Sequence, residues 1–316
     1  MTRVWLGQFH GCATVKSGEL ECWGANDVGQ LGDGTKNQSL FPVTVTVERG
    51  PFVHLALGSR HTCGFFAGLV RCWGGDARRQ VTGASRTARA TAIAAAGDRT
   101  CVLVGEEGEV RCWGGDLTDN AIPAGLVGTA VLLAVGVSNV CAAFTAPTRE
   151  VRCTGLPPML LNASVKGLAV GAKHACALLE DGTVQCWGAN ESGQLGDGST
   201  TDGASPVLVH ALPPAVEIHA AGSTTCARLA SNTVACWGDN TFHQLANGTT
   251  TKSTRPHPVQ GLMGVFELAL GGHSACARLA EGGARCWGGN EAGQLGDGTT
   301  SEHDVPMPVR SPLAAK

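Results

Sequence analysis

The feature that most constrains this 316-residue chain is a repeat of about fifty residues that carries two cysteines per unit. Three copies are nearly identical, each with a CWG(A/G)N…GQLGDG stretch, beginning at Cys22, Cys186 and Cys286. The second cysteine of each unit stands at positions 22, 72, 112, 153, 186, 236 and 286. A period in this range indicates a solenoid or a propeller.

Every unit has the same order of segments. An apolar stretch such as 266–270 is followed by Gly and polar residues, a first Cys, a short strand, a tight turn, and a return strand that ends in a second Cys, followed by Trp in six of the seven units. A Gly-rich loop and a Pro-Val segment complete the unit, and no helical periodicity appears. Four short strands separated by turn signals, repeated seven times, predict an all-β, seven-bladed β-propeller with four-stranded blades. We expect residues 1–316 to form this single propeller domain.

The two ends of the chain suggest how the ring closes. The chain begins at Val4-Trp5-Leu6, without a preceding Pro-Val segment, and it ends with the Pro-Val strand 305–309. We therefore expect the C-terminal strand to complete the first blade and close the ring. An open solenoid would instead need capping repeats, and the sequence shows none.

The cysteines of each unit lie at equal distances from a turn. Cys176 and Cys186 centre on Asp181, for example, and the separation varies among units while the midpoint stays at the turn. Residues equidistant from a hairpin tip face each other at a distance that suits a disulfide. Reduced core cysteines, metal ligands and a redox-active pair remain alternatives. The expected pairs are Cys12–Cys22, Cys63–Cys72, Cys101–Cys112, Cys141–Cys153, Cys176–Cys186, Cys226–Cys236 and Cys276–Cys286.

Composition restricts the cellular compartment and the classes of partner that we expect for this protein. The net charge of −3 offers no basic field for nucleic acid, and no run of eighteen apolar residues predicts membrane insertion. Fourteen cysteines favour an oxidising compartment, so we expect a secreted or cell-envelope protein, although no signal peptide is visible at the start of the chain. The Ala, Gly and Arg content suggests a bacterial source. We expect a monomer.

Three recurring residue types have both a functional and a structural interpretation. His10, His61 and His174, each two residues before a Cys, could form a polar ring or bond to a neighbouring blade's backbone. The Asp-Gly pairs at Asp33, Asp197 and Asp297 could bind Ca²⁺ or cap their own turns. The tryptophans could stack on a ligand or pack between blades. We expect the structural role in each case, and no metal or cofactor. The six tryptophans that follow a Cys are Trp23, Trp73, Trp113, Trp187, Trp237 and Trp287.

The CWGANxxGQLGDGT stretch resembles the regulator-of-chromosome-condensation repeat family. The variant seen here, with a cysteine pair across each hairpin, looks like the bacterial members of that family. The resemblance covers nearly the whole chain and implies the same seven-bladed propeller. It also implies protein partners, because the eukaryotic founder is a nucleotide-exchange factor for a small GTPase and a secreted bacterial relative inhibits β-lactamases. In both, partner contacts come largely from one face and include residues in the loop just before the second strand of each blade. The corresponding residues here are Phe9, Arg60, Asp98, Ser138, Lys173, Ser223 and His273.

The sequence favours a binding protein over an enzyme. It has no nucleophile elbow, phosphate-binding loop, HExxH or dinucleotide motif. We expect an extracytoplasmic scaffold that presents a rigid loop face to a protein partner. The alternatives are a secreted enzyme inhibitor, an exchange factor for a small GTPase, and an enzyme acting on polysaccharide at the propeller mouth.

Overall fold

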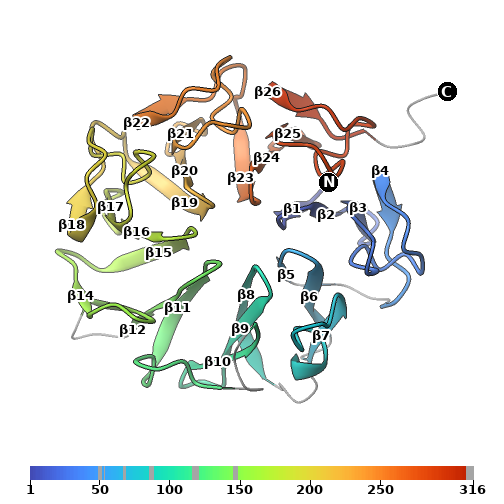
Figure 1. The fold of residues 1–316 in the computed structure, drawn as a ribbon, viewed down its shortest axis with the longest axis horizontal. Coiled ribbons are helices and arrows are strands. Elements are labelled where there is room, and N and C mark those ends of the chain that lie inside the picture. Colours follow the sequence, from blue (N-terminus) through green and yellow to red (C-terminus); the bar gives the residue numbers. More distant parts are fainter. Residues whose placement is uncertain are drawn as a thin grey trace.

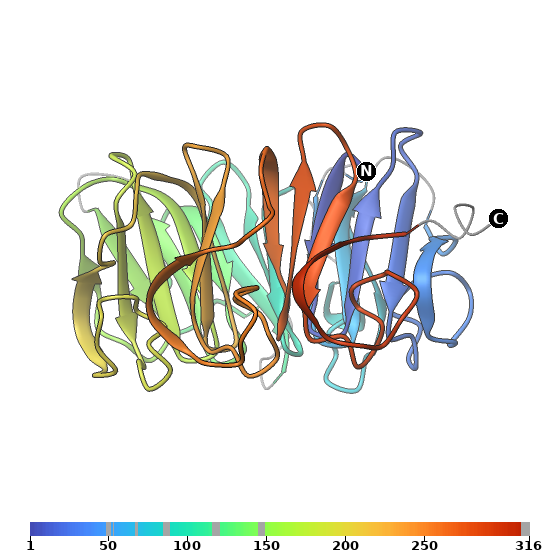
Figure 2. The same cartoon turned by 90° about the horizontal axis from the view of Figure 1, so that it is seen from above.

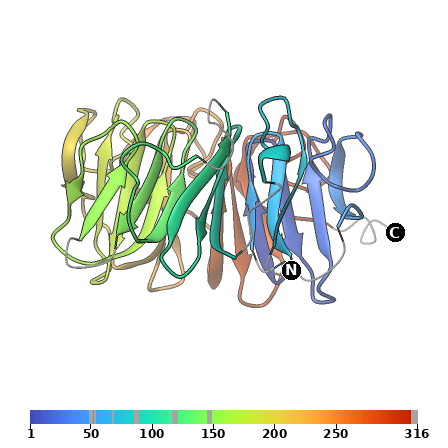
Figure 3. The same cartoon turned by 90° about the horizontal axis from the view of Figure 1, so that it is seen from below.

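The computed structural model is a ring of seven antiparallel sheets arranged around a central axis (Figure 1). It describes residues 1–48, 52, 54–66, 69–84, 89–115, 121–144 and 149–310. The chain follows the ring in sequence order, and each sheet is one blade of a β-propeller. In the side views the ring is a flat disc, with the strands crossing its thickness and the loops on its two faces (Figures 2 and 3).

Five blades have four strands, and blades 2 and 3 have three among the described residues. Blade 1 contains β1 (Arg3–Leu6), β2 (His10–Thr14), β3 (Leu20–Gly24) and β4 (Ser39–Thr44). Blade 2 contains β5 (Leu55–Leu57), β6 (His61–Phe66) and β7 (Leu69–Gly74), followed by the 3-10 turn η1 (Thr82–Ala84). Blade 3 contains β8 (Ala90–Ala96), β9 (Arg99–Val104) and β10 (Glu109–Gly114).

The remaining four blades each have four strands in sequence order. Blade 4 contains β11 (Ala130–Val135), β12 (Val140–Phe144), β13 (Glu150–Cys153) and β14 (Met159–Leu160). Blade 5 contains β15 (Val165–Val170), β16 (His174–Leu179), β17 (Val184–Gly188) and β18 (Gly203–Leu208). Blade 6 contains β19 (Ala215–Ala221), β20 (Thr224–Leu229), β21 (Val234–Gly238) and β22 (Ser253–Pro258). Blade 7 contains β23 (Val265–Leu270), β24 (Ser274–Leu279), β25 (Ala284–Gly288) and β26 (His303–Pro308).

The expected closure by the C-terminal strand is wrong. β26 pairs with β25 in blade 7, and blade 1 has its own outer strand, β4. Each Pro-Val strand therefore belongs to the blade whose hairpin precedes it, because it returns antiparallel to that hairpin's second arm. The ring closes by packing between whole blades, with β1 lying against β23 and β24.

The Pro-Val strands form the outer edges of blades 1, 5, 6 and 7. In β18, Val207 lies opposite Cys186, and Pro206 directly precedes it. Proline has no N–H to donate, so it is tolerated at a sheet edge and discourages pairing with another chain. The sequence motif thus marks the outermost strand.

The apolar core is divided into seven clusters, one at each interface between neighbouring blades. The cluster between blades 7 and 1, for example, joins Leu295 and Ala269 to Trp23 and Val4. Each blade is therefore stabilised mainly by its two neighbours, as in other repeat architectures.

The predicted disulfides are confirmed. The register places each cysteine pair directly opposite, and all seven pairs are bonded, with Cα atoms 4.0–4.1 Å apart. Each bond joins the second and third strands of one blade, as the constant midpoint predicted. None of the cysteines is free.

Tryptophans connect five of the blades to the blade before them. Trp73 of blade 2 donates its Nε1–H to the carbonyl of Gln30 in blade 1 at 3.0 Å, and Trp23 donates to Gln294 of blade 7 at 2.8 Å. The same bond recurs from Trp113, Trp237 and Trp287. Trp187 lacks it because blade 4, which precedes it, has lost the glutamine loop. The packing role of the tryptophans is confirmed, since all six are buried.

Glycines at the channel rim let the blades approach each other closely. A Cβ added at Gly7, Gly136 or Gly271 would lie within 3 Å of a carbonyl oxygen of the next blade. None of these glycines has a positive φ. The requirement is therefore steric, because only a residue without a side chain leaves room for the neighbouring backbone.

We expect Gly271→Ala to destabilise the propeller by about 1–3 kcal/mol, because its methyl group would meet the Gly7 carbonyl oxygen where blades 7 and 1 join. Gly167→Ala is the matched control: it lies in β15, and its added Cβ meets nothing closer than 3.6 Å. Thermal unfolding of both variants tests this. Equal melting temperatures for the two would contradict the steric argument.

Candidate partner-binding face

The seven residues singled out by the resemblance lie on one face of the ring. Each is in the connection between the first and second strands of its blade, and these inner strands all run in the same direction. The connections therefore gather around one mouth of the central channel. The structure places all seven candidates there: Phe9, Arg60, Asp98, Ser138, Lys173, Ser223 and His273.

The backbone at these positions is fixed while the side chains vary. The carbonyl of Lys173 accepts a hydrogen bond from the Ala189 amide at 2.9 Å, and the carbonyl of Arg60 accepts one from Gly75 at 2.7 Å. Phe9, Ser223 and His273 accept the same bond from the start of their own blade's Gly-rich loop. Because the main chain makes this bond, the side chain can change without altering the loop.

Two of the candidates form ion pairs with the Gly-rich loop of the preceding blade. Arg60 of blade 2 pairs with Asp27 of blade 1. Asp98 of blade 3 lies 3.6 Å from Arg78 of blade 2, and it accepts a hydrogen bond from Gln80 Nε2 at 3.3 Å. These pairs are substantially exposed, so each contributes little to stability, but they order the side chains of the face.

The remaining candidates differ in exposure. His273 packs its ring against Phe242 of blade 6, with centroids 4.4 Å apart. Lys173 and Ser138 are exposed, and Arg99 donates to the Ser138 carbonyl at 3.3 Å. Asp27, Arg78 and Phe242 reach the same face but were not predicted. Their signal was their place three or four residues after a Cys-Trp-Gly, at the start of the Gly-rich loop of blades 1, 2 and 6.

A cavity of about 200 Å³ lies in the mouth of the channel and is lined by residues of all seven blades. Its walls are mostly glycine and small apolar residues, including Gly136, Val137, Ala220 and Leu270. His273 is the one predicted face residue that lines it. The cavity offers main-chain groups and apolar surface, so the charged groups of this face lie around it rather than within it.

The three histidines form bridges between blades. His174 Nε2 of blade 5 lies 2.8 Å from the Thr225 hydroxyl of blade 6, and His10 and His61 make equivalent contacts to Thr62 and Thr100. The structural role is confirmed, but the partner is a threonine hydroxyl rather than the expected backbone. Threonine supplies both a donor and an acceptor, so it can bond a neutral imidazole and a second group together.

Burial keeps these imidazoles neutral. It lowers the pKa of His174 to about 4 and that of His61 to about 4. Burial and the nearby His61 lower the pKa of His10 to about 3. A charged imidazole would have to leave water without a counter-ion, which is costly in a closed interface.

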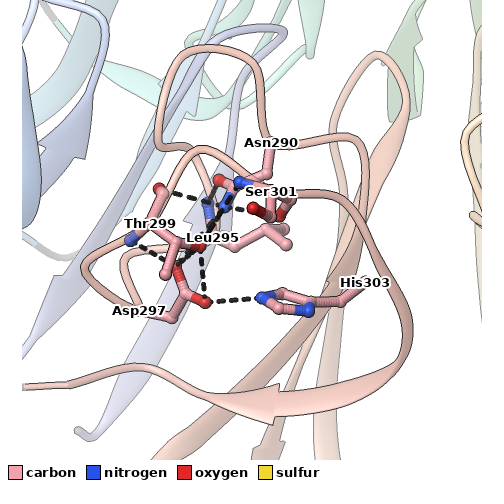
Figure 4. Close-up of polar contacts among 6 residues, drawn as sticks. All are labelled: Asn290, Leu295, Asp297, Thr299, Ser301 and His303. Atoms are coloured by element: carbon pink, nitrogen blue, oxygen red, sulfur yellow. Dashed lines mark hydrogen bonds and ion pairs between the residues drawn. The ribbon is translucent and has the colours of Figure 1, made fainter.

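In blades 1, 5, 6 and 7, one asparagine holds the Gly-rich loop. In blade 7, the buried Asn290 donates from Nδ2 to the Thr299 carbonyl at 3.1 Å, and its Oδ1 accepts from the Leu295 amide at 3.0 Å (Figure 4). Asp297 accepts from the Thr299 amide at 3.0 Å and from His303 Nε2 at 2.6 Å (Figure 4). The turn-capping role predicted for the Asp-Gly aspartates is therefore confirmed. The equivalent asparagines are Asn26, Asn190 and Asn240.

The environment of Asp297 keeps it ionised. Burial raises the pKa of this carboxyl group, but hydrogen bonds from His303 and Thr299 outweigh burial and hold the pKa below the usual value for aspartate.

Among the described residues, no group of three or more His, Cys, Asp or Glu side chains is placed to hold a metal ion. In the described part of the chain, no helix is long and apolar enough to cross a membrane.

We expect the free energy of unfolding to decrease as the pH falls from 6.5 toward 4. In this pH range the histidines of the unfolded chain, with pKa near 6.5, bind protons, whereas the buried imidazoles of the folded protein stay neutral. Each such histidine contributes a slope of about 1.4 kcal/mol per pH unit within this window. His174→Gln removes the contribution of one histidine. In denaturant titrations between pH 6.5 and 5, the free energy of unfolding of this variant should therefore depend less steeply on pH. Parallel curves for the variant and the parent would contradict the buried neutral state.

Comparison with known proteins agrees with the repeat pattern. Two family models, both described as "Regulator of chromosome condensation (RCC1) repeat", match the chain. One matches residues 17–65 and 181–228, and the other matches residues 165–194. The chain is 28% identical over 213 residues to the E3 ubiquitin-protein ligase HERC2 of Homo sapiens, covering 65% of this chain and 4% of that protein. It is 27% identical over 214 residues to the ultraviolet-B receptor UVR8 of Arabidopsis thaliana, covering 66% of this chain and 45% of that protein. The chain thus spans less than half the length of either relative.

Solved structures share the fold at low sequence identity. The CRINKLY WD40 ectodomain of the Arabidopsis thaliana receptor kinase ACR4 matches with a TM-score of 0.64 and 18% identity, covering 94% of both chains. Prp20p from Saccharomyces cerevisiae matches with a TM-score of 0.57 and 19% identity, covering 98% of this chain and 77% of that one. The predicted resemblance is confirmed: this chain is a seven-bladed β-propeller that carries repeats of the regulator of chromosome condensation family.

Proposed function

We propose that this chain is a non-enzymatic recognition module that binds a protein partner through the face formed by the connections between the first and second strands of its blades. The observation that carries the proposal is the fixed backbone of these connections beneath side chains that differ from blade to blade. Preorganised loops lose little conformational entropy on binding, and such loops are common binding surfaces on rigid scaffolds.

The compared proteins support this type of activity. Prp20p binds Gsp1p and histones, which indicates that a propeller of this architecture can serve as a protein-binding surface. Inhibition of a bound enzyme and nucleotide exchange on a bound GTPase are particular forms of the same activity. The partner of this chain is therefore sought among proteins.

The cysteine bonds support an extracytoplasmic location. Seven disulfides persist where thiols are not kept reduced, as in secreted and cell-envelope proteins. The similarity to the ectodomain of ACR4 is in keeping with this setting. We place the binding face outside the cytoplasm on these grounds.

Partner capture with the intact protein as bait, in oxidising buffer, tests the binding face. We expect Lys173→Glu to weaken capture roughly tenfold or more, because it reverses an exposed charge on the proposed face. Lys166→Glu is the matched control: it makes the same change on an exposed residue of the same blade, at the opposite end of β15. Equal weakening by both variants would place the interface elsewhere, and failure to capture any protein would contradict the proposal.

Alkylation of the protein in its native source tests the compartment. If thiols are blocked at the moment of lysis, we expect the cysteines to resist alkylation until a reductant is added, because they are paired. Mass spectrometry of the peptides reports the result. Alkylation of cysteines in every blade before reduction would contradict the extracytoplasmic assignment.

A further inference from the structure

One of the seven disulfides differs from the others in its surroundings. Thirteen of the cysteines are buried, with 4% exposure or less, whereas Cys72 of blade 2 is partly exposed. Its bonding partner, Cys63, is completely buried. The Cys63–Cys72 bond therefore joins a partly exposed residue to a fully buried one.

The outer strand is one difference between blade 2 and most of the other blades. In blades 1 and 5, Val43 and Val207 lie opposite the second cysteine and cover it, and blades 6 and 7 place His257 and Met307 there. In blade 3, Ala121 forms a bridge to Cys112. Within the described part of blade 2, β7 pairs with β6 alone.

A hydroxyl group stands next to the enclosed sulfur. Thr100 Oγ1, from blade 3, lies 3.7 Å from Cys63 Sγ and 2.7 Å from His61 Nε2. If the neutral His61 donates from Nε2 to this oxygen, the Thr100 hydrogen is free to point at the sulfur. Thr100 can thus donate to a negative charge that develops on Cys63.

The equivalent threonines donate their hydroxyl hydrogens to main-chain carbonyls instead. Thr62 and Thr225 also stand one residue before a first cysteine and also meet a histidine. Their hydroxyls donate to the carbonyls of Gln30 at 2.9 Å and Gln194 at 3.0 Å. The combination of an accessible cysteine and a hydroxyl beside its partner's sulfur therefore distinguishes the Cys63–Cys72 bond.

We propose that the Cys63–Cys72 disulfide is a thiol-exchange site, at which a small thiol or a protein dithiol attacks Cys72 while the other six disulfides stay intact. Cys72, the partly exposed residue, receives the nucleophile, and the buried Cys63 Sγ, next to Thr100, is the leaving group. Access and stabilisation of the leaving thiolate are among the factors that set the rate of such exchange.

The exchange balances without any further reactant. The thiolate of the incoming thiol forms a new S–S bond to Cys72 Sγ as the Cys63–Cys72 bond breaks, and the bonding electron pair leaves on Cys63 Sγ. That thiolate accepts the hydrogen bond from Thr100 and is then protonated by solvent. A second thiol cleaves the mixed disulfide, so two external thiols are oxidised to a disulfide and the cystine is reduced by two electrons.

Glutathione is the probe for the first test, applied to the intact folded protein at pH about 8, near the pKa of an ordinary thiol. After an acid quench, alkylation and non-reducing peptide mapping, we expect glutathione on Cys72 and an alkylated Cys63. This pair should react roughly tenfold faster than any other. Adducts on Cys63, prior reaction of another pair, or simultaneous loss of all seven bonds would each overturn the proposal.

Variants of Thr100 test the leaving-group contact. Thr100→Val removes the hydroxyl and should slow exchange at Cys63–Cys72, whereas Thr100→Ser keeps the hydroxyl and should preserve the rate. Thr225→Val is the matched control, because it removes the equivalent histidine-bonded hydroxyl in blade 6 and should leave this rate unchanged. An unchanged rate in Thr100→Val, or equal slowing in Thr225→Val, would contradict the role of Thr100. If Thr100→Val does not fold, slow exchange at Cys63–Cys72 in Thr100→Ser would also contradict the role of the Thr100 hydroxyl.

Discussion

The contact between neighbouring blades is the interaction on which the whole structure depends. Each interface has its own apolar cluster, and most add a buried tryptophan N–H bonded to a glutamine carbonyl of the preceding blade. A single four-stranded sheet of about fifty residues cannot bury enough apolar surface to be stable alone. Closing the ring gives every blade two neighbours, including blade 1, whose Trp23 bonds to Gln294 across the junction of the two chain ends.

Two kinds of covalent and steric restraint make this frame stiff. The disulfides join the middle strands of each blade, and glycines such as Gly7 and Gly271 let the inner loops approach within contact of one another. The loops on the channel face therefore rest on a backbone that is fixed before any partner arrives. Variation among Arg60, Lys173 and His273 changes the charge and shape of that face without changing the fold.

Irregular units create local differences within a regular ring. Blade 4 lacks the glutamine loop, so Trp187 of blade 5 loses its usual hydrogen bond. In blade 2, Cys72 is partly exposed, whereas the other thirteen cysteines are buried. The proposed thiol exchange depends on this difference.

The sequence by itself determined the blade number, the hairpin register and the disulfide pairs, because these depend on the local spacing of residues such as Cys176, Cys186 and Asp181 about a turn. Through the family resemblance it also located the loops of the face that we propose for partner binding. It did not determine which blade the Pro-Val strands join, because a cyclic repeat reads the same wherever the blade boundary is drawn; only the pairing of β26 with β25 decided this. The ion pair of Arg60 with Asp27 and the Thr100 contact to Cys63 likewise join different blades. Tertiary structure alone brings these residues together, since no sequence spacing fixes the distance between side chains on separate sheets.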